Sequence, residues 1–117
     1  MKKEQIQELL WQALETEMGG QKVYEAAIAC AVNNDLKEEW QKYLDETRTH
    51  EQILRETFGR IGLDPEAETP GRKVIRHKGA ALVTAMQMAQ NEGGPEAAQL
   101  VAAECVVEAE TKDHQNW

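Results

Sequence analysis

The sequence has little of what marks several common classes of protein. Its 117 residues include only two cysteines and three prolines, and aromatic residues make up 5%. Cys30 and Cys105 lie far apart and form no C-x-x-C motif, so the sequence indicates neither a zinc ribbon nor a disulfide framework. No apolar run approaches the roughly 18–20 residues that cross a bilayer. The length suits a single domain, because one core typically serves about 100–150 residues.

Basic residues are also few and scattered. Lysine and arginine number 13 against 21 acidic residues, which gives a formal net charge of −8. Proteins that bind nucleic acid or anionic membranes usually carry a basic patch, so we expect neither partner. The first twelve residues are charged and amphipathic and lack the continuous apolar stretch of a signal peptide. We therefore expect one soluble, acidic domain in the cytoplasm.

Helical periodicity dominates what is present, and no segment alternates with period two for long enough to predict a strand. A first helix is predicted over residues 3–32. Asn33-Asn34 predicts its end, because asparagine tolerates the left-handed conformation, and Asp35 is the predicted N-cap of a second helix over residues 36–61. Gly62 predicts the end of that helix. The apolar stripes are Ile6, Leu10, Ala13, Glu17, Gly20, Tyr24, Ala27 and Ala31, then Leu36, Trp40, Tyr43, Thr47, His50, Leu54, Phe58 and Ile61.

The second half of the chain also predicts helices. Residues 64–72 (DPEAETPGR) contain two prolines and a glycine and predict a loop, followed by a shorter helix over residues 78–90. Pro95 predicts the first position of a last helix over residues 95–117. Apolar residues surround the axis of that helix, which is typical of a buried helix. The sequence therefore predicts an all-α fold, an antiparallel helical bundle forming one domain over residues 1–117.

Acidic side chains and a histidine interrupt these apolar faces. Glu17 lies within the stripe of the first helix, and Glu46 and His50 lie one turn apart on the second. Glu104 and Glu108 are one turn apart on the last helix, and residues at i and i+4 face the same way. A buried carboxylate costs several kcal/mol unless it is protonated, paired or bound to metal. A metal site in the core is therefore one interpretation, and oxygen-rich sites with one imidazole suit iron or manganese, with zinc as a further candidate.

Plainer interpretations stay open at each position. Glu17 is a solvated residue in the first of them, and Glu46 and His50 form an exposed hydrogen-bonded pair in the second. The last helix then has one wet face, which carries Glu104 and Glu108. In this alternative the protein is a metal-free helical domain that dimerises or binds a partner through an apolar face.

Two segments resemble a known family. LETEMGGQ around Glu17, and LDETRTHEQILRETFGRIG from Leu44 to Gly62, are similar to the first two helices of ferritin-like proteins. The chain most resembles the bacterial YciE/YciF-like stress-response branch of that superfamily. The resemblance implies a ferritin-like bundle with a di-iron or iron/manganese carboxylate site. It also implies oxidation of Fe(II) with oxygen or peroxide, a ferroxidase- or peroxidase-type activity. The positions that match metal ligands are Glu17, Glu46, His50 and Glu108.

The sequence departs from that pattern in three places. The second helix has Glu-x-x-x-His where such sites commonly have Glu-x-x-His, and Thr111 stands where the branch tends to carry a second glutamate after Glu108. Glu104, Glu110 or His114 would have to replace that carboxylate. The branch also has a further helix that supplies more ligands, and this sequence stops before it. We therefore expect a bundle that lacks its last helix or is completed by a second protomer, in a homodimer or higher oligomer.

Overall fold

The structure, a computed structural model, describes the backbone of residues 2–116 and the side chains of residues 2–111. These residues form four helices and no strand. The predicted all-α fold is confirmed. The helices are α1 (Lys3–Cys30), α2 (Asn34–Ile61), α3 (Pro70–Glu92) and α4 (Pro95–Asn116).

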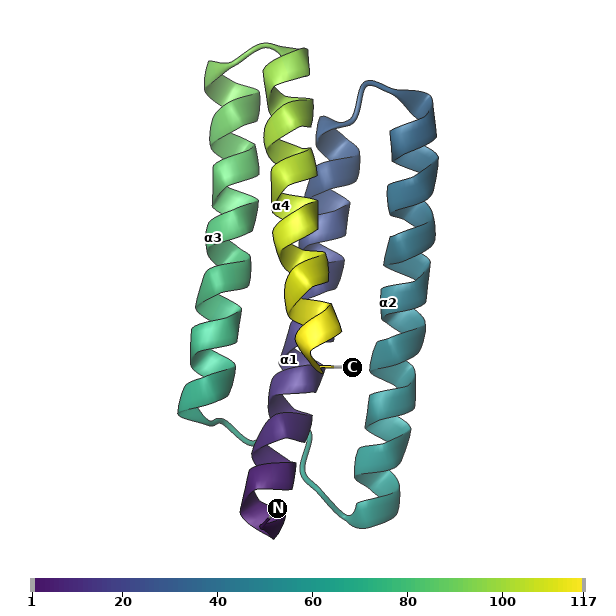
Figure 1. Ribbon diagram of the computed structural model, residues 1–117, viewed down its shortest axis with the longest axis vertical. Coiled ribbons are helices and arrows are strands. Elements are labelled where there is room, and N and C mark those ends of the chain that lie inside the picture. The colour runs from purple at the N-terminus through teal and green to yellow at the C-terminus, as the bar shows by residue number, and fades with distance from the viewer. Residues whose placement is uncertain (1, 117) are drawn as a thin grey trace.

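The helices lie side by side along one long axis, and consecutive helices run in opposite directions (Figure 1). α1 packs against all three of the others, and α3 also packs against α4. Among the described residues, the backbone of α2 comes close to that of α1 alone. α3 carries the chain back along the length of the bundle, so that α2 and α4 point the same way (Figure 1).

The connection between α1 and α2 differs from its prediction. α1 ends at Cys30, and Ala31 caps it in an extended conformation, so no asparagine adopts the left-handed conformation. Asn33 is the N-cap of α2, because its side chain accepts a hydrogen bond from the backbone N–H of Leu36. The side chain of Gln99 on α4 accepts hydrogen bonds from the backbone N–H groups of Val32 and Asn33. An extended loop that is tied to α4 therefore replaces the predicted turn.

The end of α2 is as predicted. Gly62 has φ +72°, in the left-handed region, and the backbone N–H of Leu63 donates to the carbonyl of Phe58. Such a position favours glycine because a Cβ there crowds the neighbouring carbonyl oxygen.

Replacing Gly62 with alanine is expected to lower the free energy of unfolding by about 1–2 kcal/mol, the cost of a left-handed non-glycine residue. Gly59, inside α2, is the matched control, since a Cβ there meets no atom within 4 Å. Gly59→Ala should raise stability by up to about 1 kcal/mol, because alanine is the better helix former. Urea unfolding followed by circular dichroism measures both, and equal effects at the two positions would contradict the argument.

α3 is longer than the predicted helix over residues 78–90. It begins at Pro70, and the Thr69 side chain accepts a hydrogen bond from the N–H of Arg72 as the N-cap. Proline suits the first position of a helix, because its missing N–H has no intrahelical partner there. The second proline of the predicted loop is therefore a helix start, which adds eight residues to the amino-terminal end of the helix.

The core consists of two clusters. The larger one joins the C-terminal half of α1 to α2, α3 and α4 and contains Trp40, Met86 and Val106. The smaller one joins the N-terminal half of α1 to the C-terminal half of α2 through Ala13, Leu14, Leu54 and Phe58. Both cysteines are buried free thiols, and burial raises the pKa of each, as expected for cysteines that serve as small apolar residues.

α4 is less buried than its composition predicts. Ala98, Ala102, Cys105 and Val106 face the core, whereas Leu100 and Val107 on the outer face are 63% and 61% exposed. The prediction of a helix buried on all sides is therefore wrong for the single chain. Trp117, the last residue of the predicted helix, lies outside the described residues.

None of the described helices is long and apolar enough to cross a membrane.

Candidate metal centre on the flank between α2 and α4

Glu17 is the most unusual residue on the inner face of α1. Its side chain is 3% exposed, and its Oε1 lies 3.5 Å from Nδ1 of His50 on α2. The two residues meet because Glu17 faces α2, while Thr47, one turn before His50, packs against Gly20. A buried carboxylate and an imidazole are thus brought together from separate helices.

Tyr43 lies on the same side of α2 as His50, two turns closer to the start of the helix. Its hydroxyl donates to a carboxylate oxygen of Glu39 at 2.5 Å. That hydrogen bond and burial raise the pKa of Tyr43 to about 12, and the negative charges of Glu39, Glu110 and Glu46 act in the same direction. Glu46 lies one turn after Tyr43 on α2, and Glu110 belongs to α4.

Tyr24 connects α1 to this group. Its ring lies 5.9 Å from that of Tyr43, centroid to centroid, and its hydroxyl donates to Glu110 at 3.5 Å. Glu110 is on α4, so three helices contribute side chains here. We call this region the α2–α4 flank and define it by Glu17, Tyr24, Tyr43, Glu46, His50 and Glu110.

The four predicted ligands are not all in this region. Glu17 and His50 are in contact, and Glu46 is an exposed residue one turn before His50. Glu108 is also exposed, but it lines a cavity between α1, α3 and α4 on the other side of α4. Two residues advance a helix by about 200°, so Glu110 faces the flank and Glu108 does not.

The remaining candidates contribute less. Glu104 is exposed, and the side chain of His114 lies outside the described residues. Among the described side chains, no three of the histidine, cysteine, aspartate and glutamate residues form a group arranged to hold a metal ion. The contact that the structure shows is that of Glu17 with His50, while Glu46 lies one turn before His50 on α2 and Glu110 contacts Tyr24.

Sequence reasoning missed the strongest charge cluster of the molecule. Glu15 on α1 is buried, and its Oε1 accepts hydrogen bonds from Arg72 and Arg76 of α3, both at 3.0 Å. Arg72 is 2% exposed and also donates to the carbonyls of Pro65 and Ala67. The sequence predicts a loop over residues 64–72, so it gives no helical position at which Arg72 would meet Glu15.

This cluster extends to the surface through Glu68. Arg76 donates to both carboxylate oxygens of Glu68, and these bonds lower the pKa of Glu68. The same pairing, with that of Glu15, raises the pKa of Arg76. Every charge in the cluster has a partner of opposite sign, so it holds α3 and its preceding loop against α1 and offers no open position to a ligand.

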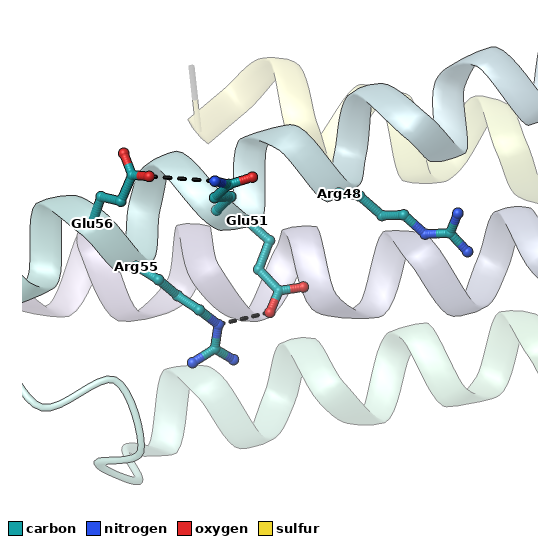
Figure 2. Close-up of a pocket in the computed structure, with 5 residues that line it drawn as sticks. Arg48, Glu51, Arg55 and Glu56 are labelled. Atoms are coloured by element: carbon teal, nitrogen blue, oxygen red, sulfur yellow. Dashed lines mark hydrogen bonds and ion pairs between the residues drawn. The ribbon is translucent and has the colours of Figure 1, made fainter.

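A surface hollow on α2 is also lined by charged side chains that pair with one another (Figure 2). It is lined by Arg48, Glu51, Gln52, Arg55 and Glu56, and Figure 2 shows Arg48 pointing away from the others. Arg55 donates to Glu51 at 2.7 Å. Burial would raise the pKa of Glu51, but hydrogen bonds from Arg55 and Gln21 outweigh it and leave that pKa lowered. These are paired surface charges of one helix.

Comparisons of this chain with family models, with curated proteins and with solved structures gave no match. The functional argument therefore depends on the geometry of the flank and on the sequence.

Proposed function

We propose that this chain is a ferritin-like, cytoplasmic metal-binding protein that holds iron or manganese on the α2–α4 flank. The observation that carries the proposal is the contact between the buried carboxylate of Glu17 and the imidazole of His50. Burial of a carboxylate costs several kcal/mol unless the group is protonated, hydrogen-bonded, paired with a positive charge or bound to a metal ion, and a metal ion is one way to meet that cost. Neutral imidazole with carboxylate oxygens is a donor set that suits iron and manganese.

The path of the chain supports the same proposal. Ferritin-like bundles contain one long crossover connection. Here α3 and its two loops carry the chain from the end of α2 to the start of α4 at the opposite end of the bundle (Figure 1). α2 and α4 consequently run parallel, with the flank between them.

The residues present fit a metal in part. Glu17 and His50 would hold the ion, and Glu46 is the nearest carboxylate on the same face of α2. An iron ion bound there would supply redox chemistry with oxygen or peroxide, which is the activity we propose in stress protection. Burial withdraws the Glu17 carboxylate from water, and the imidazole of His50 lies 3.5 Å from it.

Metal binding is tested with Co(II), a redox-stable substitute for Fe(II) that absorbs visible light when it is bound. We expect Glu17→Gln to abolish that absorption and the metal-induced rise in melting temperature. At free metal 100 times the dissociation constant, the wild-type chain should gain about 2.7 kcal/mol of stability. Elemental analysis of protein purified without chelator, with Mn(II) or Fe(II) added, gives the number of ions per chain.

The matched control is Glu25→Gln, because Glu25 is an exposed glutamate of α1 paired with Arg48. It should bind Co(II) as the wild type does. Circular dichroism verifies that both variants fold. A wild-type chain that takes up none of the three metals, or a Glu17→Gln variant that binds Co(II) normally, would contradict the proposal.

A second function is favoured by one observation. Leu100 and Val107 on α4, and Val32 in the adjoining loop, are large apolar residues that are more than half exposed. A helical domain that dimerises would cover such a surface. If the chain takes up no metal and sediments as a dimer, this interaction function replaces the first.

A further inference from the structure

A cavity of about 780 Å³ lies between α1, α3 and α4, and no residue of α2 lines it. Its volume falls within the range of about 300–1,000 Å³ that small-molecule sites occupy. The walls are mainly apolar and include Val23 of α1, Ile75 and Leu82 of α3, and Ala109 of α4. None of these residues belongs to the α2–α4 flank, so the cavity is separate from the proposed metal centre.

Gly19 leaves part of this space open. Four glycines line the cavity, Gly19 and Gly20 of α1 with Gly71 and Gly79 of α3, but a Cβ at Gly20 or Gly71 would meet the side chain of Thr47 or those of Glu8 and Gln12. A Cβ added to Gly19 would meet no atom within 4 Å, so this wall opens onto unfilled space. Each glycine inside a helix costs roughly 1 kcal/mol relative to alanine. α1 thus loses stability at Gly19, the glycine that faces the open part of the cavity.

The polar groups of the cavity limit the charge of its ligand. Gln12 and Thr16 donate hydrogen bonds within α1, to the Glu8 carboxylate and to the Gln12 carbonyl, both at 2.9 Å. Lys78 and Glu108, which are both exposed, contribute one charge of each sign. A ligand with a net charge would be attracted by one of the two and repelled by the other, whereas an uncharged apolar molecule gains from the walls without that opposition.

We propose that the cavity between α1, α3 and α4 binds a small uncharged apolar molecule, aromatic or aliphatic. Burial of apolar surface against the valine, isoleucine, leucine and alanine side chains supplies the affinity. The bare backbone at Gly19 lets the ligand lie directly against α1.

The test uses N-phenyl-1-naphthylamine, an uncharged dye that fluoresces in apolar surroundings. The full chain should bind it saturably with one dye per chain. Gly19→Leu fills the cavity from the open wall and should weaken binding at least tenfold, and Gly19→Ala should weaken it less. Gly59→Leu is the matched control, because a Cβ at Gly59 also meets no atom within 4 Å but Gly59 does not line the cavity.

Two further measurements decide between sites and ligand classes. Val107→Ser alters the exposed apolar face of α4 and should leave dye binding unchanged. Anilinonaphthalene sulfonate, an anionic dye of similar size, should bind more weakly than the neutral dye. Unsaturable binding, normal binding by folded Gly19→Leu, loss of binding in Val107→Ser, or tighter binding of the anionic dye would each overturn the proposal.

Discussion

Replacing Glu15 with alanine is expected to lower the free energy of unfolding by about 3–5 kcal/mol. The change leaves the guanidinium of Arg72, which is 2% exposed, without its carboxylate partner in the interior. Removing one member of a buried ion pair costs this much because the remaining charge stays out of water. Total stability is about 5–15 kcal/mol, so the loss should greatly lower the urea concentration at which half of the protein is unfolded.

Two comparisons separate burial from charge. Glu68→Ala removes the exposed partner of Arg76 and should cost far less than Glu15→Ala, because exposed ion pairs contribute little to stability. The double variant Glu15→Leu with Arg72→Met replaces the buried pair with apolar groups and should recover much of the lost stability. Equal losses for Glu15→Ala and Glu68→Ala would show that Arg72 does not depend on Glu15.

The second large effect is expected at Phe58. Replacing this residue alone with alanine should lower the free energy of unfolding by about 3–5 kcal/mol. The ring of Phe58 is fully buried and packs with Leu14 and Leu54 in the smaller core cluster. The truncation removes most of the large side chain that α2 places in that cluster. Chemical unfolding measures the loss, and α2 should be the helix most affected.

The control for this change is on the same helix. Ile53→Ala removes an apolar side chain that is 47% exposed and should change stability by no more than about 0.5 kcal/mol. If Phe58→Ala were as mild as Ile53→Ala, the smaller cluster would contribute little to holding α1 against α2.

Much of the fold was predictable because local chemistry and tertiary structure agree. Gly62 ends α2 and Pro95 begins α4, since backbone conformation alone decides both positions. The start of α3 was not predictable from the same rules. Pro70 belongs to a segment with a second proline and a glycine, and such a composition is equally typical of a loop. Its role follows from Thr69, which caps the helix, and from Arg72, which anchors the turn.

Of the candidate metal centre, only the contact between Glu17 and His50 was predictable from the sequence. Glu17 and His50 stand out because each interrupts an apolar stripe, and the structure brings them together. Glu108 and Glu110 could not be separated, since a helix with apolar residues on every side does not reveal which face meets α2. Glu15 was missed for a related reason. Glu15 lies outside the stripe. Its burial depends on Arg72 and Arg76, which follow it in the chain by 57 and 61 residues.

The position of α2 has a consequence for how the molecule opens. Among the described helices, its backbone approaches that of α1 alone, whereas α1, α3 and α4 pack against one another. Proteins unfold locally in cooperative units, and a unit with fewer neighbours detaches at a lower free energy than the whole molecule. α2 is therefore the unit whose amide hydrogens should exchange with solvent first, while those of α1 stay protected by the three-helix remainder. We therefore expect α1, α3 and α4 to stay packed together when α2, which carries His50, first detaches.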